Sequence, residues 1–239
     1  MNTVKISKGI TKMVAHRGVS GIEKENTNAA FIAAGNRSYF GIETDVHKTL
    51  DGKFICFHDD DTSRVCIDTM IVEQTTFDTL RSLQLTDRDG KRGRIDLRMP
   101  TLAEYIDTCK RYEKKAVLEL KNEFEKEDIA KICDIIKEAD YLQDVIFISF
   151  CFDNLVYVKE LYPEQTVQFL TSIYTEHLPL SLQENGFDLD IRYDQLTKEI
   201  IDNLHAMNIE VNCWTCDDPA EAEKLVSWGI DYITSNILE

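Results

Sequence analysis

The segment GIETDVHKTLDGKFICFHD, residues 41–59, reads as two β-strands joined by a tight turn at Asp51-Gly52. An Asp-Gly pair tolerates the positive φ angles that a two-residue hairpin loop needs. With these two residues as the loop, Asp45 lies opposite His58, and opposed side chains project from one face about 5 Å apart. Glu43 joins that face because side chains alternate along a strand. We therefore predict that two carboxylates and one imidazole converge on this hairpin.

The register of the hairpin decides which side chains meet, because a shift of one residue moves every side chain to the other face. The predicted register pairs Val46 with Phe57 on the apolar face and His47 with Cys56, one pair beyond Asp45. We interpret His47 as a residue that supports the site or faces solvent. Taken alone, the hairpin favours a functional site and a solvated acidic surface about equally.

Length and composition restrict the alternatives. A chain of 239 residues fits one large domain and is close to the length typical of an α/β barrel. Its hydrophobic content of 43% is ordinary for a globular core. The formal net charge of −16 argues against nucleic acid or an anionic membrane as a partner. An anionic substrate must then be captured by a few local cations or by a metal.

The cysteine pattern and the N-terminal sequence predict a cellular compartment. Seven cysteines, an odd number without dense spacing, are typical of reduced thiols and not of a disulfide framework. We interpret the CxxC spacing of Cys213 and Cys216 as coincidence, because it ends a predicted strand. The first residues contain no apolar signal region, and no run reaches membrane-spanning length. We predict a cytoplasmic protein without stable membrane insertion.

Strands and helices are predicted to alternate along most of the chain. Strands begin near residues 12, 41, 116, 145, 166, 187, 210 and 232, apart from the returning arm of the hairpin. We expect Asp153 to cap the helix after the fourth strand, and a short polar crossover before residue 187. Eight strands alternating mostly with helices predict an α/β fold, a (β/α)₈ TIM-type barrel. The chain then forms a single catalytic barrel domain, residues 1–239, with the weakly patterned residues 60–99 as a small insertion after the second strand.

Charged and aromatic residues stand at the predicted C-terminal ends of several strands, which is where such barrels place their active sites. Each of them alone is more often a core residue or a surface ion pair. Because several independent strands place such residues at the same rim, we predict a functional site there. The residues concerned are His16 and Arg17 after the first strand, Glu43 and Asp45 on the second, His58 on the returning arm, Glu119 and Lys121 on the third, and Trp214 on the seventh.

Glu43, Asp45 and Glu119 form a set of three oxygen ligands. Such a set suits a hard divalent cation, Mg²⁺ or Ca²⁺. Zinc is disfavoured because no cysteine joins the set and the histidines suit proton transfer better. Gathering three carboxylates without a cation would be opposed by their mutual repulsion. The sequence therefore predicts a divalent metal at this rim.

Arg17 and Lys121 supply the positive charge that a phosphate group needs, and Arg suits bidentate contact. Two histidines beside a metal-held phosphate are what in-line phosphoester cleavage requires. One of His16 and His58 would activate the attacking oxygen, and the other would protonate the leaving alcohol. The residues do not indicate which histidine has which role. Trp214 would be either a core residue or, at the rim of the seventh strand, an aromatic wall beside the organic part of the substrate.

Eight short motifs follow one another along nearly the whole chain: His16-Arg17-Gly18, Glu25-Asn26-Thr27, Glu43-Thr44-Asp45-Val46, Asp51-Gly52, His58-Asp59, Glu119-Leu120-Lys121, Ser149-Phe150 and Trp214-Thr215. In these motifs and their order the chain resembles the glycerophosphodiester phosphodiesterase family. The resemblance implies a (β/α)₈ barrel with a small insertion after the second strand, and hydrolysis of small-molecule glycerophosphodiesters to glycerol 3-phosphate and an alcohol. It also implies that His16 and His58 are the acid/base pair, that Glu43, Asp45 and Glu119 bind metal, and that Arg17 and Lys121 bind phosphate.

The chain departs from the family pattern near its end. Ser235 stands where the family more often has Asp, and Ile237 follows Asn236 where the family more often has Pro. Two further functions stay open. One is a phosphodiesterase acting on lysophospholipids, which calls for an apolar rim; the other is a non-catalytic barrel that binds phosphodiesters, which needs no acid/base pair. His177 and His205 lack a charged strand-end context, and we expect both at the surface.

Overall fold

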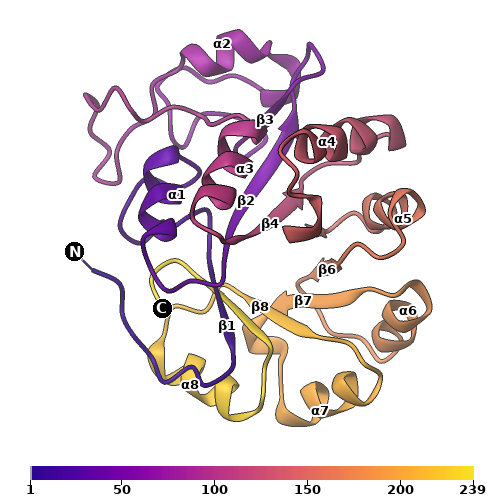
Figure 1. Cartoon of the computed structure of the whole chain (residues 1–239). Coiled ribbons are helices and arrows are strands. Elements are labelled where there is room, and N and C mark those ends of the chain that lie inside the picture. Colours follow the sequence, from indigo (N-terminus) through magenta and orange to yellow (C-terminus); the bar gives the residue numbers. More distant parts are fainter. Residues whose placement is uncertain (1) are drawn as a thin grey trace.

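Eight parallel strands close into a barrel in the computed structural model, which describes residues 2–239 (Figure 1). The strand order is β1-β9-β8-β7-β6-β5-β4-β2, and pairing of β1 with β2 closes the ring. The predicted (β/α)₈ barrel is therefore confirmed. The barrel strands are β1 (Lys12–Ala15), β2 (Gly41–Lys48), β4 (Lys115–Leu120), β5 (Val145–Ser149), β6 (Val167–Thr171), β7 (Asp188–Arg192), β8 (Val211–Trp214) and β9 (Tyr232–Ser235).

Helices surround the barrel, with α4 to α8 following one another around its outside in Figure 1. Their termini use the expected side chains: Thr101 and Glu104 form a capping box, and the Asp218 carboxylate accepts hydrogen bonds from the next helix. The helices are α1 (Asn28–Gly35), α2 (Phe77–Ser82), α3 (Leu102–Arg111), α4 (Lys126–Glu138), α5 (Phe152–Leu161), α6 (Leu178–Asn185), α7 (Lys198–Ala206) and α8 (Pro219–Ser227), with short 3₁₀ helices η1 (Val72–Gln74), η2 (Leu142–Asp144) and η3 (Tyr193–Gln195).

Two predictions about the helices are wrong. The N-cap of α5 is Cys151, and Asp153 lies inside the first helical turn, where its negative charge still favours the helix dipole. The expected polar crossover before β7 contains the helix α6, which has Pro179 in its first turn and is capped by Gly186, with φ +66°, just after its last residue. Its weak amphipathic pattern concealed it, although Pro early and Gly at the end are typical of a helix.

The register of the hairpin differs by one residue from the prediction. Strand β3 (Phe54–Cys56) pairs antiparallel with β2 so that Val46 faces Cys56 and His47 faces Ile55, and Asp45 is therefore not opposite His58. The loop has three residues, because the Thr49 amide donates to the Lys53 carbonyl at 2.8 Å. Gly52, with φ +74°, takes the left-handed position that closes such a loop.

The segment between β3 and α3 has its own set of buried residues. It contains η1 and α2, and in Figure 1 it lies beyond the β2–β3 hairpin, at the top of the view. Its interior includes Phe57, Val65, Val72, Leu80, Leu85, Leu97 and Met99. The segment is therefore packed as a unit against one end of the barrel.

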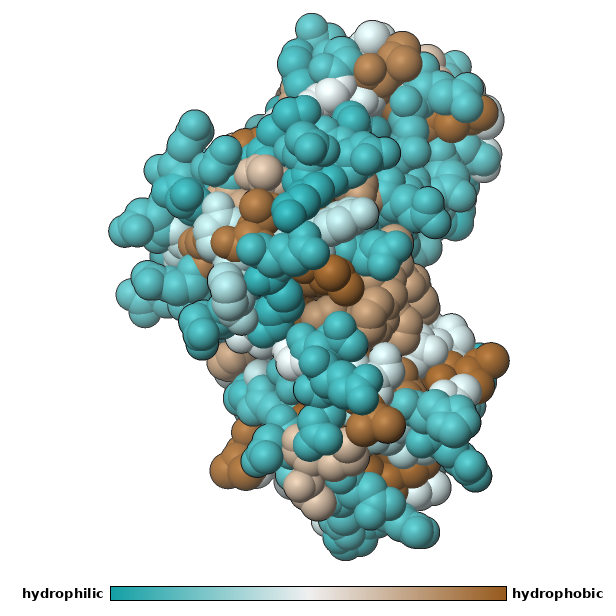
Figure 2. All heavy atoms as spheres, turned by 90° about the vertical axis from the view of Figure 1, so that its right-hand side faces the viewer, coloured by the Kyte–Doolittle hydropathy of each residue, from teal (hydrophilic) through white to brown (hydrophobic). Residues whose placement is uncertain are grey.

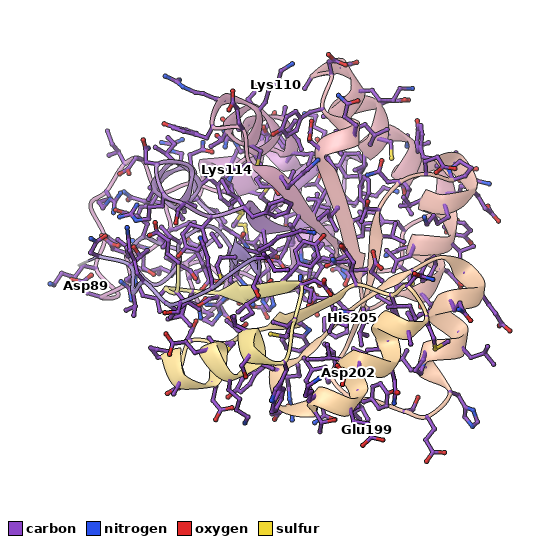
Figure 3. The ribbon with its side chains drawn as sticks, turned by 60° about the horizontal axis from the view of Figure 1, so that its bottom comes forward. Asp89, Lys110, Lys114, Glu199, Asp202 and His205 are labelled. Carbon is purple, nitrogen blue, oxygen red and sulfur yellow. The ribbon has the colours of Figure 1, made fainter. Side chains whose placement is uncertain are left out.

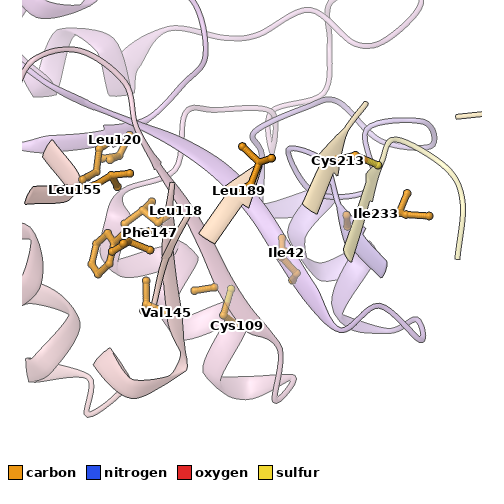
Figure 4. Packing of buried hydrophobic residues seen from close by; sticks show 14 of the residues in the cluster. Ile42, Cys109, Leu118, Leu120, Val145, Phe147, Leu155, Leu189, Cys213 and Ile233 are labelled. Atoms are coloured by element: carbon orange, nitrogen blue, oxygen red, sulfur yellow. The ribbon is translucent and has the colours of Figure 1, made fainter. Parts of the chain in front are cut away.

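Alternation along the strands separates two cores. Outward residues such as Ile42, Leu118 and Phe147 pack against the helices (Figure 4). Inward residues such as Val14, Val117 and Ile148 fill the barrel. Polar residues at inward positions near the C-terminal strand ends are consequently directed toward the barrel mouth.

The outer surface carries most of the charge. Figure 2 shows a mainly hydrophilic face over the right-hand side of Figure 1, with hydrophobic residues gathered near its middle. Figure 3 shows Asp89 in the loop after α2, and Glu199 and Asp202 on α7, at the periphery of the molecule. Within residues 2–239, every helix is too short or too polar to span a bilayer.

Candidate active site

The predicted site residues meet at the C-terminal ends of the strands, around a cavity of about 120 Å³. β1, β2, β4 and β8 each contribute, and His58 arrives from the loop that follows β3. Asp45 and Lys121 lie beside the cavity in contact with its lining, as described below. The lining residues are His16, Arg17, Glu43, His58, Glu119, Ile148, Phe150, Leu170, Asp190, Trp214, Thr215 and Thr234.

Glu43, Asp45 and Glu119 form a buried acidic cluster. One oxygen of each lies within 4.8 Å of the others, because Asp45 and Glu119 are register partners on neighbouring strands and Glu43 precedes Asp45 by two residues. Burial and the neighbouring Asp45 and Glu119 charges raise the pKa of Glu43 well above its usual range. Burial and Asp45 raise the pKa of Glu119 to about 7. Three oxygen donors that repel one another in this way fit a divalent cation.

Two cations stand against the acidic cluster. Lys121 Nζ lies 2.8 Å from Glu119 Oε1 and 3.5 Å from Asp45 Oδ1, and Arg17 Nε lies 3.7 Å from Asp45 Oδ2. Burial alone would raise the pKa of Asp45, but Lys121 and Arg17 hold it well below its usual range. Asn26 also donates to Asp45 Oδ2 at 2.7 Å. The lowered pKa keeps Asp45 ionised beside these two cations.

The His16-Arg17-Gly18 turn needs an unusual backbone. Arg17 has φ +52° and Gly18 has φ +71°, and a Cβ on Gly18 would come within 2.6 Å of the Ala30 backbone. In this conformation the Arg17 amide donates to Glu43 Oε2 at 2.7 Å, while its guanidinium donates to Glu25 Oε1 at 2.9 Å. The turn therefore ties the end of β1 to the acidic cluster on β2.

The two histidines have different partners. His16 Nδ1 lies 2.7 Å from Asn236 Oδ1, whereas His58 Nδ1 lies 2.6 Å from Asp59 Oδ1. Burial, with Arg17 adding to it, lowers the pKa of His16 to about 4. Burial also lowers the pKa of His58, against the opposing charge of Asp45. Both imidazoles line the same cavity, as two proton-transfer groups acting on one substrate require.

Arg64 connects the two sides of the site. Its Nη atoms donate to Glu25 at 2.7 and 2.8 Å, and its Nε donates to Asp59 Oδ2 at 2.6 Å. Glu25 holds Arg17 and Asp59 holds His58, so one arginine from the segment after β3 orients both partners. Arg64 was not predicted from the sequence, because nothing in the local pattern of a weakly structured stretch indicates a distant partner.

The opposite wall of the cavity is more apolar. Trp214 and Phe150 pack edge to face, with ring centroids 5.6 Å apart and planes at 82°. Asp190 also lines this part, and burial, followed by the Glu119 charge, raises its pKa well above the usual range. Asp190 was missed, although a carboxylate at an inward position of an interior strand is a usable signal.

The other histidines, His47, His177 and His205, do not line the cavity. His47 is buried, and its Nε2 lies 3.3 Å from the backbone oxygen of His58, so it supports that loop. His205 Nε2 lies 2.7 Å from Asp231 Oδ2, on the outer helix α7 in Figure 3. His177 is exposed before α6. The last two are surface residues, as predicted.

A cavity bordered by two imidazoles, two cationic side chains and a buried acidic cluster has the kinds of group that phosphodiester cleavage requires. Residues 16–238 match the model of the glycerophosphoryl diester phosphodiesterase family, and the chain belongs to this family. The resemblance noted in the sequence is therefore confirmed.

Relatives and solved structures agree with this assignment over almost the whole chain. A glycerophosphodiester phosphodiesterase of Caldanaerobacter subterraneus is 27% identical, covering 95% of this chain and 94% of the relative. The structure of an Oleispira antarctica phosphodiesterase in complex with the product sn-glycerol-3-phosphate is 28% identical, covers 98% of this chain and 96% of that chain, and superposes with a TM-score of 0.88. A glycerophosphodiester phosphodiesterase structure from Parabacteroides distasonis is 27% identical, covers 96% and 94%, and has a TM-score of 0.79.

Proposed function

We propose that the chain hydrolyses glycerophosphodiesters to glycerol 3-phosphate and an alcohol with the help of a divalent cation. The observation that carries the proposal is the buried cluster of Glu43, Asp45 and Glu119 beside two imidazoles in one cavity. The family supports the substrate class, and the Oleispira relative binds sn-glycerol-3-phosphate as product. In this proposal residues 1–239 act as one catalytic barrel domain, with residues 60–99 as an insertion.

Each group of the cavity then has one task. Glu43, Asp45 and Glu119 would hold Mg²⁺ or Ca²⁺, which supplies Lewis-acid stabilisation of the phosphate charge. Arg17 and Lys121 neutralise the remaining charge and orient the phosphate. One imidazole takes the proton of the attacking oxygen while the other gives a proton to the leaving alcohol. Trp214 forms an apolar wall beside the organic part of the substrate.

A direct assay tests the proposal. Purified protein is incubated with glycerophosphocholine, glycerophosphoethanolamine or a lysophospholipid, each with and without added Mg²⁺ or Ca²⁺. We expect metal-dependent release of glycerol 3-phosphate from the first two. Turnover of the lysophospholipid alone would support the alternative specificity. Binding without turnover of any of them would support the non-catalytic barrel.

The Arg17 side chain offers a sharper test of phosphate binding, because it is 17% exposed and belongs to a strongly acidic chain. Loss of a charged contact to a buried anion costs about 2 to 5 kcal/mol, so Arg17→Ala should lower kcat/KM by about 30-fold or more. Arg17→Lys should recover only part of this, since a lysine cannot reproduce the bidentate geometry. Arg111→Ala, an exposed change on α3, serves as control. Full activity of Arg17→Lys would show that the fork geometry is irrelevant.

A further inference from the structure

Hydrogen-bonded polar groups from the ends of three neighbouring strands lead to Nδ1 of the His16 ring. β8, β9 and β1 are adjacent in the barrel, and Asp217, Asn236 and His16 lie just beyond their C-terminal ends. Asn236 Nδ2 donates to Asp217 Oδ2 at 2.6 Å, and Asn236 Oδ1 lies 2.7 Å from His16 Nδ1. Asp217, Asn236 and His16 therefore form a continuous relay that ends at the cavity.

The relay determines how the Asn236 amide is oriented. An ionised carboxylate can only accept hydrogen bonds, and Asp217 accepts from both the backbone amide of Asn236, at 2.8 Å, and its side-chain Nδ2. The Asn236 oxygen must then face the other way, toward His16. The Ser20 hydroxyl lies 2.6 Å from the same oxygen and 2.8 Å from the His16 carbonyl. The Asp217 carboxylate is therefore the contact that fixes the orientation of the amide.

The orientation of the amide in turn selects one tautomer of His16. A neutral imidazole has one N–H and one acceptor nitrogen. Because Asn236 Oδ1 can only accept, the ring proton is on Nδ1, and Nε2 keeps its lone pair. The His16 amide also donates to the Ser235 carbonyl at 2.9 Å, which fixes the backbone that carries the ring. The ring is thus prepared to accept a proton at Nε2.

We propose that Asp217 is a positioning residue for the reaction, which acts through Asn236 to hold His16 in the Nδ1–H tautomer with Nε2 free as proton acceptor. This inference rests on the proposed function for its catalytic meaning. In the proton transfer, Nε2 takes the proton of the attacking oxygen, and the Nδ1 proton stays on its hydrogen bond to Asn236. The resulting His16 imidazolium contacts the side-chain oxygen of Asn236. The negative charge of the Asp217 carboxylate lies on the other side of that amide.

The neighbouring Ser235 contacts the same carboxylate. Its hydroxyl donates to Asp217 Oδ1 at 2.8 Å. Asp217 is therefore held by hydrogen bonds from both Ser235 and Asn236. His58 is held differently, since Asp59 contacts its ring directly. The two imidazoles have different electrostatic support as a result.

The substitution Asp217→Asn tests the proposal with two readouts. The new amide can present either its oxygen or its nitrogen, so Asn236 is free to flip and the His16 tautomer becomes mixed. Loss of the partner that orients a metal-bound imidazole typically costs about 10- to 100-fold in activity, and we apply the same scale to an imidazole oriented for proton transfer. We expect a loss of this size in kcat with KM nearly unchanged. The ¹⁵N chemical shifts of the His16 ring should move from the Nδ1–H pattern toward an average of both tautomers.

Two matched variants complete the experiment. Asp218→Asn removes the same charge from the same loop, and an asparagine still caps α8 well, so it should leave kcat and the His16 shifts unchanged. The exchange Asp217→Asn with Asn236→Asp returns a carboxylate to the relay, directly against Nδ1. It should restore the Nδ1–H tautomer and most of the lost kcat.

The outcomes separate the two proposals. A normal kcat in Asp217→Asn overturns the positioning role, and so does a lowered kcat with the His16 tautomer unchanged. If the unmodified protein releases no glycerol 3-phosphate from any glycerophosphodiester, the proposed function fails instead. The ring ¹⁵N shifts of the variants would still decide whether Asp217 controls the tautomer. Thermal unfolding of each variant shows that the fold is retained.

Discussion

Replacing His16 or His58 with alanine will lower kcat by about 10²- to 10⁴-fold, the usual contribution of a general acid or base. Both imidazoles line the cavity, and neither belongs to the acidic cluster, so fold and metal binding should survive. The double variant should lose less than the product of the two losses, because groups that act together are not additive. His205→Ala, a surface change, is the control.

The leaving group distinguishes the two roles. Burial lowers the pKa of both imidazoles, but His16 Nδ1 faces an amide oxygen, whereas His58 Nδ1 faces the Asp59 carboxylate, which stabilises a protonated ring. We therefore expect His16 to be the base and His58 the acid. A p-nitrophenyl phosphodiester has a good leaving group and needs no acid, so it should rescue His58→Ala and not His16→Ala. Equal rescue of both variants, or of neither, would contradict separate roles.

Removal of the divalent cation should abolish turnover. Without it the three buried carboxylates repel one another, as the raised pKa values of Glu43 and Glu119 indicate. EDTA should therefore stop the reaction, and excess Mg²⁺ or Ca²⁺ should restore it. Loss of a group that merely supports a ligand costs about 10- to 100-fold in metal affinity, so Asp45→Asn or Glu119→Gln should cost more than about 100-fold.

Calorimetric titration with Mg²⁺ and Ca²⁺ measures this affinity without reference to activity. Glu176→Gln removes an exposed carboxylate from the loop after β6, at the same end of the barrel, and should bind metal normally. Undiminished turnover in excess chelator would contradict the metal assignment. Full metal affinity in Glu119→Gln would remove that residue from the ligand set.

The sequence was sufficient to predict the barrel and the convergence of charged side chains at the ends of its strands. Strand alternation and the strand count are local properties, and a closed parallel barrel then places strand ends together. The hairpin register was not predictable in the same way, because Asp51-Gly52 suits loops of two or three residues. His58 still reaches the cavity, since the ladder ends at Cys56 and the chain leaves the strand before His58.

The residues that orient the site were missed for a different reason. Arg64, Asp217 and Asn236 act on partners that are distant in the sequence, and each stands in a loop without periodic pattern. Only the three-dimensional path of the loops shows which carboxylate an arginine or an amide will meet. Asp190 differs, because its inward orientation could have been predicted from the alternation of side chains along β7.

Arg64 contacts both Glu25 and Asp59, so the segment after β3 that carries it is part of the active site. A local opening of this segment would free Glu25 and Asp59 together, and with them the guanidinium of Arg17 and the ring of His58. Such openings require far less free energy than unfolding of the barrel. Inactivation by heat or denaturant should consequently precede loss of the fold, and an exchange of this segment between relatives must retain an arginine that spans both carboxylates.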